Sequence, residues 1–418
     1  MKKSFLKFLP LTAAVLFATS CSKDENNDEK NIENQPKVEK VVIPFSVKVN
    51  TSNSISKIAY TQSGDNVSQF NVNFEEKDAA AGSAITMNIT GDDIENTTLT
   101  LTQDGSDFKF VGDVTLAEGK TEDDFKNGNI SISGSFGTAG TTTVTSTTSL
   151  ADVMSNCSHQ YTTTFASNAT TIELIDNYAY LEVSCASTQT KFNLTIGGSA
   201  QDYTPSTTNN KIWIAVPNGT SVTGNMIKSM TVVGGKVYRA NRTKEVDLGP
   251  GFSVLWTTCN LGASKPGEYG NYYAYGETTG YALGSGHNFS SISYTGQENP
   301  LSSEHDAATA VLGEGYRMPT SGDNSEQSAL ANCSRTWETQ DGNAGYKFYT
   351  DYGSVFLPAA GYYEGAVRKS GGSRGYYWSS TPYGESDAIC LYFYSGRAGV
   401  NANYRNLGQS VRAVRCMN

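Results

Sequence analysis

The feature that most restricts the fold of this chain is a repeated, short alternation of apolar and polar residues. Phe45, Val47 and Val49 alternate with polar neighbours, and similar runs follow at residues 70–74, 85–89, 98–102 and 130–133. Residues two apart on a strand lie on the same face, so each run predicts a strand with one buried and one wet face. Short strands without a long helical pattern predict antiparallel β-sandwiches over residues 39–240.

A stretch rich in Thr, Ser and Gly at residues 137–149 interrupts this pattern. It either divides the region into two lobes or forms edge strands. Further strands are expected at residues 171–174, 178–183, 192–198, 211–217 and 230–238. We therefore expect a first lobe over residues 39–145 and a second over residues 146–241.

The N-terminus has the layout of a secretory signal over residues 1–20. Lysines at positions 2, 3 and 7 precede the apolar run Leu9–Phe17, which is shorter than the ~20 residues that span a bilayer. The sequence Ala18-Thr19-Ser20-Cys21 that follows resembles a lipobox, whose cysteine receives a lipid. Cys21 is therefore the expected lipidation site, and an ordinary signal peptide with an incidental cysteine is the alternative.

Residues 21–38 are expected to form a disordered tether. The stretch Ser22–Glu29 is polar and acidic and cannot bury apolar surface. It resembles the acidic export signal that sends some lipoproteins to the outer face of the outer membrane; a plain linker is the alternative. The N-terminus thus predicts a surface-exposed lipoprotein held at the outer membrane by a lipid such as palmitate.

Charge and cysteine content restrict the partners. A net charge of −10 argues against nucleic acid, because phosphate binding needs a basic face. In an oxidising compartment the remaining cysteines could pair or stay free, and the sequence cannot choose among the pairings. They are Cys157, Cys185, Cys259, Cys333, Cys390 and Cys416. No Cys or His spacing suggests zinc, so we expect no metal and no cofactor.

Arginine usage marks a boundary near residue 241. Every arginine lies between Arg239 and Arg415, and Trp256, Trp337 and Trp378 also follow this point. The change in composition predicts a separate C-terminal domain over residues 242–418.

The order of strand segments over residues 39–241 resembles the fimbrillin-like family, the subunits of lipoprotein-derived (type V) pili. This resemblance implies two successive transthyretin-like β-sandwich lobes; some other surface β-sandwich is the alternative. Shaft subunits of that family are trimmed after an arginine to free a groove for donor-strand exchange. Because no arginine precedes Arg239, arginine-specific trimming is excluded, which favours a tip or accessory role, although lysine-directed cleavage stays open.

Several blocks of the C-terminal region resemble, in order, the major-paralogous-domain family of bacterial surface proteins. They are Gly315–Thr320, Phe356–Gly361, Tyr377–Ser380 and Ser410–Arg415. The resemblance implies an α+β C-type-lectin-like fold after the two β lobes, in a chain that is mainly β. In this domain we expect core positions for Trp256 and Trp378, a buried hydrogen-bond network around Arg317, and a helix over Ser325–Cys333.

Calcium-dependent sugar binding and catalysis are not expected. The Glu-Pro-Asn, Gln-Pro-Asp and Trp-Asn-Asp motifs that supply calcium ligands in many C-type lectins do not occur in the sequence. The fold also resembles formylglycine-generating enzymes, but Cys390 and Cys416 have no adjacent base to lower a thiol pKa. We therefore predict no metal site, no catalytic residues and no enzyme activity.

The end of the chain is dense in side chains that suit a binding surface. Tyr and Arg give large contact area at low entropic cost, and Asn gives adaptable hydrogen bonds. The candidate ligand-binding residues are Tyr376, Tyr383, Tyr392, Tyr394, Arg397, Asn401, Asn403, Tyr404, Arg405 and Asn406. Within them, alternation predicts Leu391 and Phe393 inward and Tyr392 and Tyr394 outward. Ordinary loops without a ligand are the alternative.

The predicted function is a surface lipoprotein adhesin, at a pilus tip or as an accessory subunit. Its C-terminal domain is expected to bind a glycan or a protein on a host or bacterial surface, with other fimbrial subunits as further partners through donor-strand exchange. A glycan-capture lipoprotein outside any fimbrium and a purely structural fimbrial subunit are the alternatives.

Overall fold

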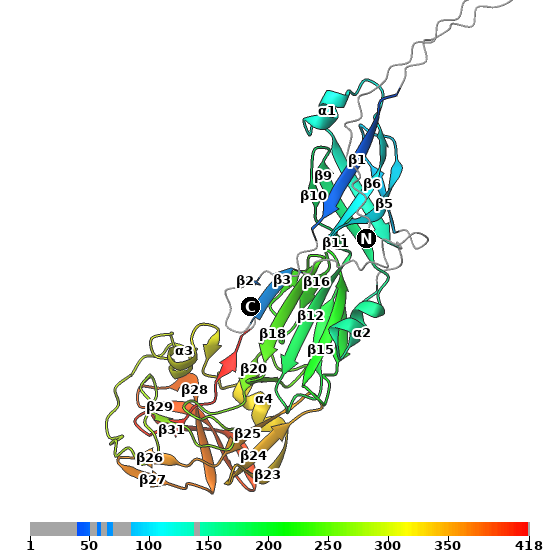
Figure 1. The fold of residues 1–418 in the computed structure, drawn as a ribbon. Helices are drawn as coiled ribbons and strands as arrows, with labels where there is room; N and C mark the ends of the chain where they lie inside the picture. Colours follow the sequence, from blue (N-terminus) through cyan, green and yellow to red (C-terminus); the bar gives the residue numbers. More distant parts are fainter. Residues whose placement is uncertain (1–39, 51–56, 60–64, 70–84, 138–142, 417–418) are drawn as a thin grey trace, which may run out of the picture. The chain divides into compact units, whose positions relative to one another are not determined.

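The computed structural model describes residues 40–50, 57–59, 65–69, 85–137 and 143–416 (Figure 1). Strands predominate over these residues, so the expectation of a mainly β chain is confirmed. The helices among them are short: α1 (Glu122–Lys126), α2 (Leu150–Ser155), α3 (Ala307–Leu312) and α4 (Glu326–Asn332). Over the described residues, no helix has the length and apolar character needed to cross a membrane. The expected signal, tether and lipidated Cys21 lie outside these residues.

The first sheet has eight strands, and its alternating sequence fixes which face is buried. Phe45, Val47 and Val49 of β1 are buried, and so are Met87 and Ile89 of β4, which confirms the predicted alternation in both strands. The predicted run at residues 70–74 lies outside the described residues. In spatial order the strands are β10 (Thr171–Ile172), β1 (Val42–Val49), β6 (Asp107–Thr115), β5 (Thr97–Asp104), β4 (Thr86–Thr90), β7 (Ser131–Gly137), β9 (Gln160–Ala166) and β11 (Ile175–Asp176).

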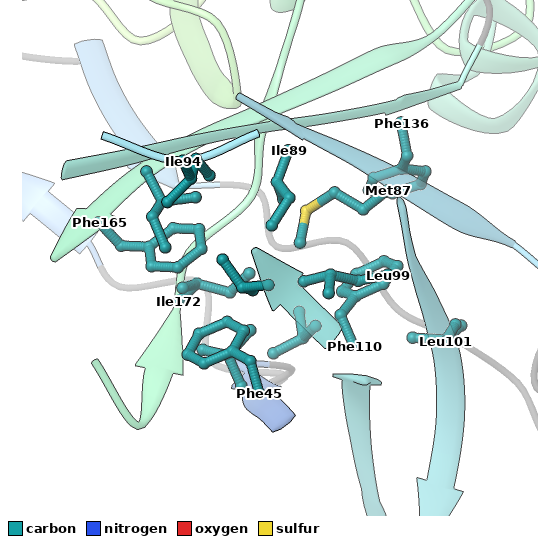
Figure 2. Packing of buried hydrophobic residues seen from close by; sticks show 14 of the residues in the cluster. Phe45, Met87, Ile89, Ile94, Leu99, Leu101, Phe110, Phe136, Phe165 and Ile172 are labelled. Atoms are coloured by element: carbon teal, nitrogen blue, oxygen red, sulfur yellow. The ribbon is translucent and has the colours of Figure 1, made fainter. Parts of the chain in front are cut away.

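The first sheet curls around one core. Figure 2 shows Phe45, Phe165 and Ile172 pointing toward the same interior as Leu99 and Phe110. Phe45 of β1 stacks on Phe165 of β9, with 5.9 Å between ring centroids, although these strands are not neighbours in the sheet. One sheet can therefore bury its own apolar face without a second sheet.

The second β region contains two sheets that share a core. Leu181 and Ile214 of the larger sheet pack with Phe192 and Leu194 of the smaller one. The larger sheet, part of which is labelled in Figure 1, has the order β2 (Lys57–Ala59), β3 (Asp65–Gln69), β18 (Lys236–Arg242), β12 (Tyr178–Cys185), β15 (Lys211–Pro217) and β8 (Thr145–Thr147). The smaller has β14 (Ser199–Tyr203), β13 (Phe192–Ile196), β16 (Ser221–Thr223) and β17 (Met230–Thr231).

Strand pairing does not follow the expected division at residue 145. β9, β10 and β11 follow that residue in sequence but pair in the first sheet, whereas β2 and β3 precede it and pair in the second region. Local alternation defines a strand but not its hydrogen-bonding partner, so the sequence could not show this exchange. The Thr-rich stretch contributes β8, which is an edge strand of the larger sheet.

The C-terminal region contains four small sheets. β18 ends at Arg242 and the first strand of the next sheet begins at Glu245, close to the expected boundary. The first of these four sheets has the order β19 (Glu245–Asp247), β20 (Leu255–Thr257), β32 (Val414–Arg415) and β22 (Tyr316–Arg317), and the second has β21 (Tyr272–Tyr273), β31 (Gln409–Ser410), β28 (Arg374–Tyr383), β29 (Asp387–Tyr394) and β30 (Arg397–Tyr404). The third sheet contains β23 (Ser334–Gln340), β24 (Asn343–Tyr349) and β25 (Ser354–Pro358). The fourth pairs β26 (Tyr362–Glu364) with β27 (Val367–Lys369).

Several sequence predictions for this region are confirmed. Trp256 and Trp378 are 1% and 0% exposed and lie in its two main cores. The predicted helix is α4, whose N-cap Ser325 accepts a hydrogen bond from the Ser328 amide and whose C-cap is Cys333. Arg317 donates to the Glu326 carboxylate across 2.5 Å, so the predicted charge-assisted bond joins β22 to the start of α4, but with its side chain 23% exposed the network is only partly buried.

Candidate functional site

Strands β28, β29 and β30 place most of the predicted binding residues in cross-strand rows. In the first row, Tyr394 lies between Arg374 and Arg397; in the second, Tyr392 lies between Tyr376 and Gly399. Side chains of directly opposed residues lie on the same face of a sheet. The predicted residues that share this face are Tyr376, Tyr392, Tyr394, Arg397, Asn401 and Asn403.

Four tyrosines form a continuous series of ring contacts on this face, which we call the tyrosine ladder: Tyr362, Tyr376, Tyr392 and Tyr394. Successive ring centroids are 4.8, 5.0 and 5.9 Å apart, within the range of favourable aromatic pairs. Tyr376 is 8% exposed, Tyr362 and Tyr392 are half-buried, and Tyr394 is 39% exposed. The ladder is therefore packed around Tyr376 and most open to solvent at Tyr394.

The opposite face of the same strands is core. Leu391 and Phe393 are 1% and 0% exposed, which confirms their predicted inward orientation, and Tyr392 and Tyr394 point to the ladder face. Phe393 packs against Trp337, Tyr346 and Phe348. The buried face thus fixes the strands rigidly beneath the ladder.

The hydroxyl groups of the ladder differ in their surroundings. Burial raises the pKa of Tyr376, and a hydrogen bond from Arg374 offsets part of that rise. The hydroxyls of Tyr392 and Tyr394 have no hydrogen-bond partner among the residues that the structure describes. Two amphipathic rings therefore present unused polar groups beside an aromatic surface.

Tyr362, Arg374 and Gly399 also belong to this face and were not predicted from the sequence. Arg374 is two residues before Tyr376, so the two-residue period of a strand could have placed both on one face. Tyr362 comes from the separate strand β26, and no local signal joins it to Tyr376. Gly399 contributes open space to this face because it has no side chain, and residue type alone does not indicate such a role.

Tyr383 and Tyr404 belong to another part of the surface. Each is 62% exposed, and both are paired in register with Asp387 at the far end of the strands. Asp387 and Tyr394 are the two ends of β29, roughly 20 Å apart at the usual rise per residue. The predicted residues therefore do not form one site.

Arg405 is corrected from a surface residue to an interior one. It is 1% exposed, and its guanidinium donates to the carbonyl oxygens of Asp387, Tyr294, Gly296 and Gly384 at 2.6–3.0 Å. These bonds tie the loop at residues 294–296 to the turn before β29, so no donor points to solvent.

Asn403 and Asn406 are also held by the fold. The Asn403 amide donates to Cys390 Sγ at 3.3 Å, and the Asn406 amide donates to the Phe289 carbonyl at 3.2 Å. Asn401 is exposed and remains available on the ladder face. Of the predicted residues, the candidate site thus keeps Tyr376, Tyr392, Tyr394, Arg397 and Asn401.

The six cysteines after Cys21 are all unpaired in the structure. Desolvation raises the pKa of Cys390 to about 12, of Cys185 to about 12 and of Cys333 to about 11. A thiol that keeps its proton is a weak nucleophile, so these three are suited to packing rather than reaction. Within the described ranges, no group of three or more His, Cys, Asp or Glu side chains could hold a metal ion.

A separate cleft of about 760 Å³ lies among β19, β20, β23, β24 and β25. Its charged lining includes both signs, with Lys244 and Lys347 beside Glu245 and Glu338. Glu245 is already bonded to Tyr316 and lies 3.5 Å from Arg415. None of the predicted binding residues lines the cleft, and its mixed charge selects no ligand class.

Comparison with known proteins gives one partial match. Residues 331–414 match a family model described as a domain of unknown function, DUF8237. No curated protein matches the chain. No solved structure matches it either. The matched segment runs from the end of α4 to β32 and so includes the whole tyrosine ladder.

Proposed function

We propose that this chain is a surface-exposed lipoprotein adhesin that binds a glycan or protein ligand through the tyrosine ladder. The observation that carries the proposal is the ladder itself: contacting tyrosines open to solvent at Tyr394 on a rigid sheet. Tyrosine rings stack on sugar rings and dominate protein hot spots, and rigid support lowers the entropic cost of binding.

The proposed architecture is a fimbrillin-like stalk that carries a C-type-lectin-like domain. The two sheets of the second region pack face to face across one core, which supports a transthyretin-like sandwich. In the C-terminal region, β32 pairs with β20, so the two ends of the domain are joined in one sheet. Such closure presents the intervening segments, including the ladder, as one compact unit.

The proposed location is the outer face of the outer membrane, through a lipid on Cys21, with incorporation at a pilus tip or as an accessory subunit. A role in which the N-terminal strand is not cut off is supported by β1, because Phe45, Val47 and Val49 of this strand complete the first core. Loss of β1 would open that core, and no arginine precedes it to direct an arginine-specific cut.

The test of ligand binding replaces ladder tyrosines in the full chain. We expect Tyr392→Ala and Tyr394→Ala to lower adhesion of expressing cells, and binding of the purified protein to a glycan and protein array, by about tenfold each. Tyr349→Ala is the matched control, because Tyr349 and Tyr394 are both 39% exposed but Tyr349 lies on β24. Unchanged binding by both ladder variants would refute the proposal and favour a structural subunit.

The anchoring and assembly parts have separate tests. Labelled palmitate should enter the wild-type chain and not Cys21→Ser. Purified pili should carry the protein if it is a fimbrial subunit. Its recovery only in the outer-membrane fraction, with ligand binding intact, would instead support a glycan-capture lipoprotein outside any fimbrium.

A further inference from the structure

The first row of the ladder face brings two guanidinium groups to either side of one exposed ring. Tyr394 is paired in register with Arg374 on β28 and with Arg397 on β30. Both arginines are exposed. Neighbouring strands are about 4.8 Å apart, so the two arginine backbones are roughly 10 Å apart, within reach of one small ligand.

We propose that the ladder face selects an acidic sugar, with its carboxylate or sulfate held by Arg374 and Arg397 and its ring stacked on the ladder. This inference rests on the proposed ligand-binding function and narrows it to an anionic glycan. A guanidinium matches the geometry of an acidic group with two parallel hydrogen bonds, and a tyrosine ring matches the apolar face of a sugar.

Neither arginine has a carboxylate partner among the residues that the structure describes. Arg374 donates a hydrogen bond to the Tyr376 hydroxyl, and Arg397 makes no side-chain hydrogen bond to a described residue. Some other surface cations are paired, as in Lys48–Asp107, Lys109–Asp104 and Lys369–Glu364. The exposed Lys244 and Lys265 form no salt bridge to a described residue. In a chain of net charge −10, two neighbouring arginines without a carboxylate partner form a local positive site.

Gly399 leaves space for the sugar ring beside Tyr392. It is paired with Tyr392 in register, and a Cβ atom built there would meet no atom within 4 Å. The backbone does not require glycine, because Gly399 is not among the residues with positive φ. Asn401, exposed on the same strand, adds an amide that can bond sugar hydroxyls.

The experiment uses the full mature chain on an array of paired glycans: each carboxylated or sulfated glycan beside the same glycan without its acidic group. We expect the acidic members to bind at least about tenfold more tightly, with affinity falling as salt rises. The carboxylated and sulfated arms show which acidic group is preferred.

Variants assign the effect to this face. Arg374→Gln and Arg397→Gln should each remove most of the preference for acidic glycans, so that an acidic glycan binds about as weakly as its neutral partner. Gly399→Val should lower binding of acidic and neutral members alike by about tenfold, because it fills the space beside Tyr392. Lys265→Gln is the matched control, an equal change of charge at an exposed cation between β20 and β21.

Equal binding of acidic and neutral partners, or a preference that survives both arginine changes, would overturn the acidic-sugar inference and leave glycan binding intact. Binding only to protein on the array, abolished by Tyr394→Ala, would overturn the inference but not the adhesin proposal. No binding to either class would overturn both.

Discussion

The two faces of the sheet formed by β28, β29 and β30 have similar side chains but differ in environment at the end that carries Tyr394. Farther along the ladder face, Trp378 and Cys390 are buried in a core of their own. Tyr377, Leu391 and Phe393 on one face are at most 1% exposed, whereas Tyr394 on the other is 39% exposed. Both faces are rich in aromatic residues, so composition does not distinguish core from surface here. What distinguishes them is the presence or absence of a covering layer: α4 and β24 pack over one face, and no described element covers the open end of the other.

Buried and exposed polar groups also differ in whether they are hydrogen-bonded. The Tyr377 hydroxyl donates to the Pro358 carbonyl at 2.7 Å and accepts from the Asn260 amide at 3.2 Å, so it is satisfied inside the core. Arg405 donates four of its five N–H groups to backbone carbonyls, whereas Arg397 makes no side-chain hydrogen bond to a described residue. Substituting one buried and one exposed residue of the same or a similar type therefore tests whether the two environments differ in their contribution to stability.

The largest effect is expected from Phe393→Ala. Removal of a fully buried ring leaves a cavity among Trp337, Tyr346 and Phe348 and should lower the free energy of unfolding by about 3–5 kcal/mol. Tyr394→Ala, one residue along, should cost less than about 1 kcal/mol. Hydrogen exchange of β28 and β29 in the full chain measures both, and equal losses would show that the two faces are not different.

Arg405→Gln should cause the next largest loss of stability. Four backbone carbonyls lose a charged donor, and we expect a loss of about 2–4 kcal/mol together with faster exchange at residues 294–296. Arg397→Gln should change stability by less than about 0.5 kcal/mol, since its side chain is exposed. Chemical denaturation compares the pair; a large loss from Arg397→Gln would place that residue in the fold rather than in the site.

Tyr377→Phe should cost about 1–3 kcal/mol, because it removes two buried hydrogen bonds. The Pro358 carbonyl keeps its bond from the Ala360 amide, and the Asn260 amide keeps its bond to the Tyr269 carbonyl. Tyr376→Phe, on the ladder face, should be close to neutral. The two proteins differ by one hydroxyl at neighbouring positions, so thermal unfolding of both isolates the effect of orientation. A neutral Tyr377→Phe would argue against the buried network.

Alkaline pH should reveal the same difference. Burial raises the pKa of Tyr377 well above its ordinary value of 10.0, so above about pH 10 the unfolded chain loses a proton that the folded chain keeps. Stability therefore falls as pH rises through that range, by at most about 1.4 kcal/mol per pH unit for this group. Tyr377→Phe should show a shallower fall than the wild type, measured by urea unfolding at several pH values; identical slopes would contradict the shift.

The sequence predicted strands better than sheets. Alternation placed Phe45, Val47 and Val49 inside β1 and Leu391 and Phe393 inside β29, because a strand has a fixed two-residue period. It could not show that β9–β11 close the first sheet or that β2 and β3 join the second, since backbone pairing has no side-chain code. The expected boundary at residue 145 was wrong for this reason.

For the candidate site, the sequence by itself determined the residue types and, by alternation, the shared face of Tyr392 and Tyr394. Only the tertiary structure decided that Tyr362 joins them, that Tyr383 and Tyr404 lie at the other end of the strands, and that Arg405 is interior. The physical reason is burial, because whether an arginine binds a ligand or four carbonyls depends on segments that are distant in the chain. That Arg374 and Arg397 flank Tyr394 followed only from the register of three strands.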